Sequence, residues 1–345
     1  MHMLERRELA GLSGAALAWQ VLDRPASALT RRSGRVSEPV VQFTEGIADQ
    51  AQHLDDQEGS TAEMFVGDQF HAVARLLSRT GSGTTAGQRL ATSLARLAQT
   101  AGFMAHESLK DTPAQRWYLI GLRAAHAAAD RPLTASILGL MCNQAAARGE
   151  TGESLQLAAA ADEAASHAPA AVRALVKART GLAYAAAGDL SAFRRTREHT
   201  LHLMNAAHAH CDPLPRWAYY ITSTELNAIA GRSLVRLARR IPSRQHRLLD
   251  EAEHLLTGRA QSSDGSRRSS VRHSTWLALA HTQAGNLDRA VDAGARALEL
   301  LPAITSARIT GLLARLRDDM SRAPGPASVR SLVTQLDQIP ARTNA

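Results

Sequence analysis

The chain has 345 residues, of which 45% are apolar and 4% aromatic, and its formal net charge is +8. This length and apolar content suit a folded protein with a large core. No stretch reaches the roughly 18 consecutive apolar residues of a membrane span, which argues against a membrane protein. Cys142 and Cys211 show no disulfide spacing, and they indicate a protein of the reducing cytoplasm.

The positive charge comes almost entirely from arginine, because Lys110 and Lys177 are the only lysines. Arginine favours bidentate contacts to carboxylates and phosphates. The basic excess therefore supports affinity for anions without naming one.

Residues 1–37 are predicted to form an N-terminal helix followed by a joint. Arg6-Arg7, the apolar run Leu9–Leu22 and Ala26-Ser27-Ala28 imitate a twin-arginine export signal. Glu8 and the interruptions within the run favour an amphipathic first helix, or a junction left where an upstream domain is missing.

Residues 38–80 are predicted to form a helical cap, with helices over Glu38–His53 and Thr61–Ser78. The polar run Leu54–Ser60 between them predicts a turn. The loop from Thr80 to Gly87 superficially resembles a phosphate loop, but it lacks the Gly-Lys-Ser/Thr ending and follows no strand pattern. We interpret it as a flexible link before a helix that starts near Thr85.

Residues 81–345 are predicted to be a helical array. The segment is rich in alanine, the best helix former, and alternating β-branched and aromatic runs are nearly absent. Glycine and proline divide it into segments of helix length. The breaks are expected near Lys110, Asp130, Gly149, His167, Gly188, Cys211, Pro242, Gly258, Gly285, Pro302 and Pro324.

The clearest internal unit lies between Ser274 and Pro302. It contains Leu277-Ala278, His281, Gly285, Ala290, Ala297 and Pro302 in the order and spacing of a tetratricopeptide repeat, which it resembles. Ser274 stands at the usual Trp position and Gly294 at the usual Phe position, and Trp276 is expected to supply the missing bulk. The resemblance implies an all-α fold, a right-handed superhelix of antiparallel helix pairs.

Weaker copies lie upstream. Cys142, Ala145 and Gly149 share one spacing with Gly181, Tyr184 and Gly188, while the Gly102 copy lacks the turn glycine. The small residues are expected where the two helices of a pair cross. The copies are wider than the usual repeat of about 34 residues, so a helical bundle without repeats remains an alternative.

A wider resemblance covers most of the chain from Glu5 onward. It rests on loose motifs such as Leu54-Asp55-Asp56-Gln57-Glu58-Gly59, Leu97–Ala105, Ala114–Tyr118, Asn143–Ala146 and Arg216–Tyr220. They resemble the sensor half of actinobacterial helix-turn-helix regulators of the phage-repressor (XRE) class. The resemblance implies a sensor role in regulation. Only four residues precede Glu5, so we expect an excised sensor region or a stand-alone relative without sequence-specific DNA binding.

A cluster of histidines has a structural rather than a functional interpretation. His199, His202, His208 and His210, with Cys211 and Asp212, match no standard zinc spacing, and we interpret them as solvated helix-end groups rather than a metal site.

The strongest basic stretch contains Arg232, Arg236, Arg239, Arg240, Arg244 and Arg247, with Arg267, Arg268 and Arg272 further on. Without aromatic residues for base stacking, nucleic-acid contact is the weaker interpretation. We interpret the stretch as a solvated helix face paired with Asp250, Glu251 and Glu253.

No catalytic constellation is evident in the sequence, so we predict a binding protein without cofactor or metal rather than an enzyme. The first helix of each pair should line a concave groove. We predict that this groove binds a peptide, a protein or a small signal. The alternatives are a scaffold or homodimer without a small ligand, and a small-molecule enzyme. The predicted groove residues are Arg96, Gln99, Phe103, His106, Asn143, Trp217, Tyr220, Glu225, Arg272 and Thr275, with Ser136 and Leu279 beside them.

Overall fold

The computed structural model describes residues 36–210, 213–262, 266–323 and 325–339, and in these ranges fourteen α-helices follow one another without a β-strand. The predicted all-α class is confirmed. The helices are α3 (Glu38–Glu58), α4 (Glu63–Thr80), α5 (Thr85–Glu107), α6 (Asp111–Ala127), α7 (Arg131–Arg148), α8 (Thr151–Ala164), α9 (Ala170–Ala187), α10 (Leu190–His210), α11 (Ser223–Arg240), α12 (Gln245–Ala260), α13 (Arg267–Ala284), α14 (Leu287–Leu300), α15 (Ala307–Ser321) and α16 (Ala327–Asp337).

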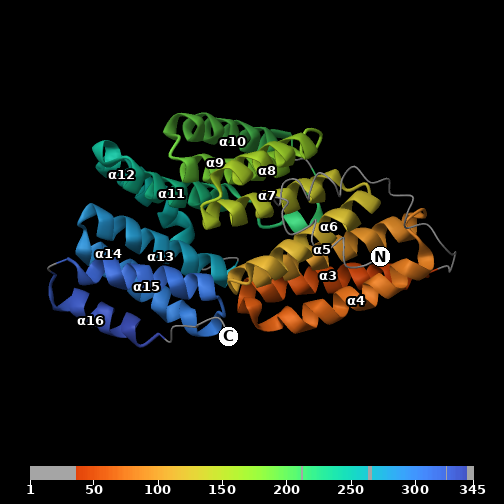
Figure 1. The fold of residues 1–345 in the computed structure, drawn as a ribbon, viewed down its shortest axis with the longest axis horizontal. Helices are drawn as coiled ribbons and strands as arrows, with labels where there is room; N and C mark the ends of the chain where they lie inside the picture. The colour runs from red at the N-terminus through yellow and green to blue at the C-terminus, as the bar shows by residue number, and fades with distance from the viewer. Residues whose placement is uncertain (1–35, 211–212, 263–265, 324, 340–345) are drawn as a thin grey trace, which may run out of the picture.

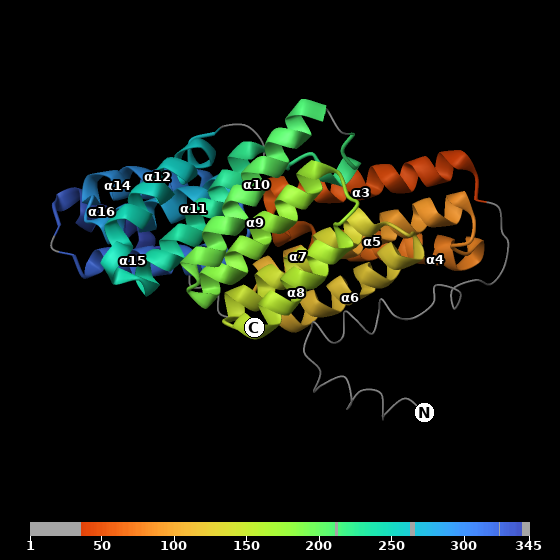
Figure 2. The ribbon, with the colours of Figure 1, turned by 90° about the horizontal axis from the view of Figure 1, so that it is seen from above.

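From α5 onward the helices pack as six consecutive pairs, and α3 and α4 each pack mainly on α5 rather than on each other. The first helix of each pair also contacts the first helix of the next pair, which makes an inner row of α5, α7, α9, α11, α13 and α15. Seen from above, α7–α10 lie between the C-terminal helices and the N-terminal ones (Figure 2). The two ends of the row meet, because α13 contacts α3 and α15 contacts α5 (Figure 1).

Glycine ends three of the inner helices where the sequence predicts a turn. Gly149, Gly188 and Gly285 have φ of 82°, 79° and 80°, and each caps its helix in the left-handed region. A side chain is strained at such φ values, so glycine is the natural residue there. These three predicted breaks are confirmed.

Small residues lie where the two helices of a pair approach closely. A Cβ on Gly102 would lie 2.6 Å from the ring of Tyr118 on α6, whereas a Cβ on Gly181 would lie 3.5 Å from Phe193 on α10. The Cys142 thiol lies 3.5 Å from the Ser154 hydroxyl on α8. The prediction that small side chains mark the crossing of paired helices is confirmed at these positions.

The missing aromatic residue of the clearest unit has a structural replacement. A Cβ on Gly294 would lie 2.7 Å from Leu332 of α16, so α16 fills the space that a phenylalanine would take. Trp276 lies elsewhere, beside the central cavity.

The turn predicted over Leu54–Ser60 is wrong, because α3 continues to Glu58 and ends only at Gly59, whose φ is 75°. Asp55 is buried and forms an ion pair with Arg268 of α13. The polar run therefore forms the last turn of helix α3, which the ion pair between Asp55 and Arg268, more than 200 residues away in the sequence, stabilises.

The loop before α5 is shorter than predicted, and α5 starts at Thr85 as expected. Thr84 accepts a hydrogen bond from the Gly87 amide, and Thr80 and Ser82 are buried. This loop is a packed helix cap rather than a free link.

The apolar core has two parts. One cluster runs from α3 to the start of α11 and includes Leu97, Tyr118 and Leu138, and the other runs from the end of α9 to α16 and includes Leu234 and Leu313. They lie next to each other at α9–α11, whereas the contact of α13 and α15 with α3 and α5 is mainly polar. The predicted segment 1–37, with Arg6-Arg7, lies outside the described residues except for its last two positions. No described helix combines the length and the apolar character needed to cross a membrane.

We expect Gly102→Ala to destabilise the protein by about 1–3 kcal/mol, because the added methyl group overlaps the fully buried Tyr118 ring. Gly181→Ala is the matched control. It meets only ordinary contacts and should be neutral or stabilising by up to about 1 kcal/mol. Urea unfolding measures both, and equal effects of the two substitutions would contradict the crossing geometry.

Candidate functional site: a central arginine-rich cavity

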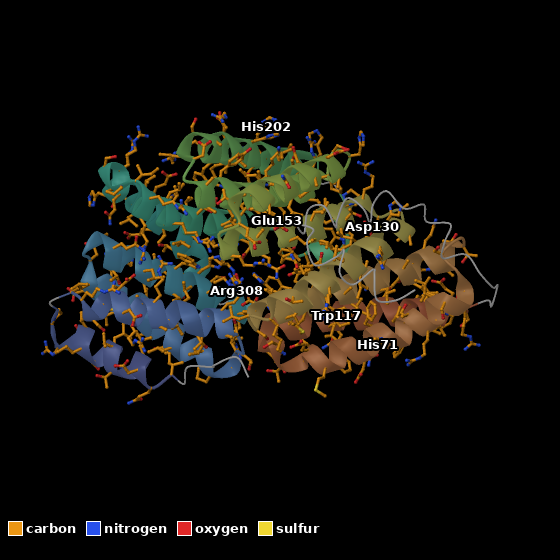
Figure 3. The ribbon with its side chains drawn as sticks, in the orientation of Figure 1. His71, Trp117, Asp130, Glu153, His202 and Arg308 are labelled. Carbon is orange, nitrogen blue, oxygen red and sulfur yellow. The ribbon has the colours of Figure 1, made fainter. Side chains whose placement is uncertain are left out.

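A cavity of about 650 Å³ lies at the centre of the molecule, surrounded by α3, the inner-row helices and the segment 219–222. Figure 3 shows Arg308 of α15 near this centre. The cavity exists because the row of first helices curves until its ends meet, so side chains from residue 52 to residue 315 face the same space.

The cavity wall is strongly basic. Eight arginines and four acidic residues line it, which leaves four uncompensated positive charges. The arginines are Arg179, Arg232, Arg236, Arg259, Arg268, Arg272, Arg308 and Arg315, and the acids are Asp55, Asp56, Glu107 and Glu225.

The contact between the two ends of the row is an ion-pair network centred on Glu107. This carboxylate is 2% exposed and lies 2.8 Å from Arg272 Nη2 and 3.8 Å from Arg308 Nε, and it accepts a 2.7 Å hydrogen bond from the Ser306 hydroxyl. Burial alone would raise the pKa of Glu107, but Arg272, Arg268 and Arg308 hold it below its usual range. Glu107 is therefore ionised and joins α5 to α13 and α15.

Two further contacts strengthen this junction. Arg268 forms ion pairs with Asp55 and with Asp56 of α3, the second at 3.2 Å, and its guanidinium lies 4.5 Å from the Phe103 ring centroid. The Ser60 amide donates to the Thr305 carbonyl at 3.0 Å. The junction is thus mostly polar, although it is buried.

The remaining acid of the wall is also engaged. Glu225 of α11 lies 3.1 Å from Arg259 Nε and accepts a 2.8 Å hydrogen bond from the Ser269 hydroxyl. Arg179 donates to the Ser136 carbonyl at 2.8 Å and to the Tyr220 hydroxyl at 3.1 Å. Five of the eight arginines therefore have partners, and every acid of the wall is already used.

Three arginines of the wall form no ion pair with any carboxylate of the described residues: Arg232, Arg236 and Arg315. The buried Nε of Arg232 has no hydrogen-bond acceptor. Burial, together with Arg272 and Arg236, lowers the pKa of Arg232 to about 9, and burial with Arg308 and Arg315 lowers the pKa of Arg236 to about 10. These side chains remain cationic at neutral pH in a place that disfavours their charge.

The indole of Trp276 brings two of these arginines together. The guanidinium carbons of Arg236 and Arg315 lie 5.5 and 5.9 Å from its ring centroid. Such cation–π contacts replace part of the lost hydration but supply no counter-charge.

The structure brings seven of the ten predicted groove residues to this cavity. Three lie elsewhere: Arg96 pairs with Asp49 at 2.6 Å, Trp217 is buried in the first apolar cluster, and Thr275 is buried and donates to the Val271 carbonyl. Of the residues expected beside the groove, Ser136 and Leu279 are fully buried. The seven that line the cavity are Gln99, Phe103, His106, Asn143, Tyr220, Glu225 and Arg272.

The interpretation of the arginine stretch as a solvated helix face is wrong for four of its members, which line the cavity: Arg232, Arg236, Arg268 and Arg272. The acids assigned to pair with it have other partners, because Asp250 lies 3.7 Å from His246, Glu251 2.6 Å from Arg194 and Glu253 2.6 Å from Arg289. Arg239 and Arg240 do lie at the exposed end of α11.

Sequence reasoning missed Arg232, Arg236, Arg308 and Arg315 as site residues. For Arg232 and Arg236 the signal is their helical spacing. Glu225, Ile229, Arg232 and Arg236 follow one another on α11 at steps of four, three and four residues and share the cavity face.

The histidine cluster forms no metal centre in the described part of the chain, where no group of three potential metal ligands comes together. His202 points outward from α10 (Figure 3). Cys211 and Asp212 lie outside the described residues.

No protein-family model matches this chain, and searches of curated proteins and of solved structures find no match either. The site is therefore interpreted from its own geometry and charge. It belongs to an all-helical protein with a cationic central cavity.

We expect Arg232→Met to stabilise the protein at pH 7 by about 1–3 kcal/mol, because it replaces a partly buried, unpaired charge, whose Nε is fully buried, by an apolar side chain of similar length. The exposed Arg247 offers the control Arg247→Met, which should stay within about 0.5 kcal/mol of the parent. Chemical denaturation measures both values. Destabilisation by Arg232→Met would show that Arg232 has a counter-charge in the folded protein.

We expect His273 to make the protein acid-sensitive. This residue is fully buried, its Nδ1 donates to the Ser269 carbonyl at 2.8 Å, and its Nε2 has no partner. Burial lowers the pKa of His273 to about 3, so only the unfolded state takes up a proton as pH falls below about 6.5. The stability contributed by neutral His273 should therefore be fully present above that pH and decline below it.

The contribution of His273 alone lowers the free energy of unfolding by about 1.4 kcal/mol between pH 7.5 and pH 5.5. In His273→Gln the difference in unfolding free energy between these two pH values should shrink by that amount. In His254→Gln, which alters an exposed histidine, it should not change. An unchanged pH dependence in His273→Gln would contradict the assignment.

Proposed function

We propose that this chain is a tetratricopeptide-type sensor module that binds a small, negatively charged ligand in its central cavity. The observation that carries the proposal is the cavity itself, about 650 Å³ in volume with four uncompensated positive charges on its wall. Ligand sites in proteins typically measure about 300–1,000 Å³.

The helix-pair architecture supports a repeat superhelix. Six consecutive pairs, glycine turns at Gly149, Gly188 and Gly285, and an inner row of first helices fit a right-handed array of tetratricopeptide type. In our proposal the array curves until α13 and α15 reach α3 and α5, and its concave groove becomes the cavity.

The size and charge of the cavity favour a small signal over a folded protein partner. The proposed ligand is a small acidic molecule, or the acidic end of a short peptide, because guanidinium groups bind carboxylates and phosphates. The resemblance to regulator sensor regions suggests a place in the control of transcription or secondary metabolism within the cytoplasm. We propose no reaction for the site.

Blocking the cavity should abolish ligand binding. Gly311 lines the cavity, is exposed, and has open space where a Cβ would lie, so Gly311→Trp adds a large ring at the accessible side of the cavity without a clash at Cβ. Gly46→Trp is the control, because Gly46 is also exposed within a helix, has the same open space and lies outside the cavity.

Binding should be measured by thermal shift and by calorimetry against inorganic phosphates, small di- and tricarboxylates, and short acidic peptides. At least one of these anions should bind the parent protein and the Gly46→Trp variant. Gly311→Trp should weaken that binding by about tenfold or more. Equal binding by both variants would place the site outside the cavity and refute the proposal.

A further inference from the structure

The unpaired arginines lie near one another on the cavity wall. Arg232 and Arg236 come from α11 and Arg315 from α15, and the Trp276 indole holds Arg236 and Arg315 over one ring. Arg308 of α15 acts on the same group, because its charge helps to lower the pKa of both Arg232 and Arg236. We call these four residues the arginine cluster.

The cluster has almost no counter-charge of its own. Of its four members only Arg308 forms an ion pair, with Glu107 at 3.8 Å, and that carboxylate is closer to Arg272. Glu225 and Asp319 act on Arg232 and Arg315 only from beyond ion-pair distance. Buried guanidinium groups are normally paired, since an uncompensated buried charge is unfavourable. The Nε of Arg232 is buried and has no acceptor, so this guanidinium lacks part of its usual hydrogen bonding as well as a paired carboxylate.

We propose that the arginine cluster is the binding site for a small molecule that carries two or more phosphate groups. The inference rests on the proposed function, that the cavity binds an anion, and it names the chemical class of that anion.

Charge favours phosphate over carboxylate. A phosphate group carries about 1.5–2 negative charges at neutral pH and offers three acceptor oxygens, whereas a carboxylate carries one charge and two oxygens. Two phosphates therefore balance the four charges of the cluster, and four carboxylates would be needed for the same effect. The planar guanidinium fork also matches phosphate oxygens in a bidentate manner.

The aromatic side chains do not provide a free stacking platform. Guanidinium groups already lie over two aromatic rings of the wall, Arg236 and Arg315 over Trp276, and Arg268 and Arg272 over Phe103. Tyr219 and Tyr220, the other two, come from the segment 219–222 and not from the helices of the cluster. Recognition at the cluster is therefore by phosphate charge and geometry rather than by stacking on a base.

The enclosure favours a small molecule over nucleic acid. The cluster lies within a cavity of about 650 Å³, whereas contact with a nucleic-acid backbone needs an open basic stripe. The exposed end of α11 does not supply such a stripe, because Arg239 forms an ion pair with Asp319 of α15.

Tripolyphosphate is the probe, and citrate is the carboxylate comparison. Calorimetry and thermal shift on the full chain, at constant ionic strength and without divalent cations, should show that tripolyphosphate binds at least about tenfold more tightly than citrate. Pyrophosphate should also bind, and inorganic phosphate should bind weakly, because a single group cannot span the cluster. Citrate binding that equals tripolyphosphate binding, or no tripolyphosphate binding at millimolar concentration, overturns the inference.

The matched variants are Arg232→Gln/Arg236→Gln and Arg244→Gln/Arg247→Gln. Both remove two positive charges from the same region of the chain, but Arg244 and Arg247 are exposed and lie outside the cavity. The first double variant should lose about tenfold or more in tripolyphosphate affinity, and the second should bind like the parent protein. Equal losses would show nonspecific charge attraction and overturn the inference.

A second variant controls for folding. Arg232→Lys/Arg236→Lys keeps both charges but removes the guanidinium fork, and we expect an affinity between those of the parent and the glutamine variant. Both cavity variants should melt cooperatively, with a midpoint no lower than that of the parent, since they relieve or retain the same repulsion.

Failure of the inference can be separated from failure of the proposed function. If citrate or an acidic peptide binds and Gly311→Trp prevents it, the cavity is the ligand site and only the phosphate assignment is wrong. If tripolyphosphate binds the parent and Gly311→Trp equally well, both proposals are wrong.

Discussion

The arrangement of this protein depends on one buried carboxylate, Glu107. The two apolar clusters lie next to each other at α9–α11, so they hold the helix row together on one side of the cavity. On the other side, Glu107 joins α5 to α13 and α15 through Ser306, Arg272 and Arg308. Without this junction the inner row would be an open curve and the cavity a groove. Because the carboxylate is buried, the junction requires arginine partners, and those arginines also form the cavity wall.

The fold could be predicted where local chemistry sets it. Gly149, Gly188 and Gly285 end helices because their own backbone conformation excludes a side chain, and that information is local in the sequence. The run after Leu54 was predicted as a turn from its polarity, yet Asp55 is buried by an ion pair with Arg268. A contact between residues so far apart leaves no trace in local periodicity. The meeting of the two ends of the row was therefore not predictable from pattern alone.

The residues of the cavity could likewise be predicted only in part. The first helix of each pair was expected to line a groove, and residues such as Asn143, Glu225 and Arg272 do face one space. Arg232 and Arg236 were assigned to solvent because acids nearby in the sequence offered partners. Both arginines share a helix face with Glu225, so the cavity face of α11 could be predicted from the sequence. The contribution of α15 could not be predicted from the sequence, because Arg308 and Arg315 belong to a helix outside the recognised repeat copies.

The cavity keeps a net positive charge because only some of its arginines are paired with acids. Glu107, Glu225, Asp55 and Asp56 are all used to hold helices together, and each of them engages an arginine of the wall. No acid of the wall remains for Arg232, Arg236 and Arg315, which repel one another or their neighbours instead. A purely structural wall would be more stable with apolar side chains at these positions. Their presence is accounted for when an anion supplies the missing charge, because its binding would then relieve the repulsion between helices α11 and α15 and stabilise the junction beside them.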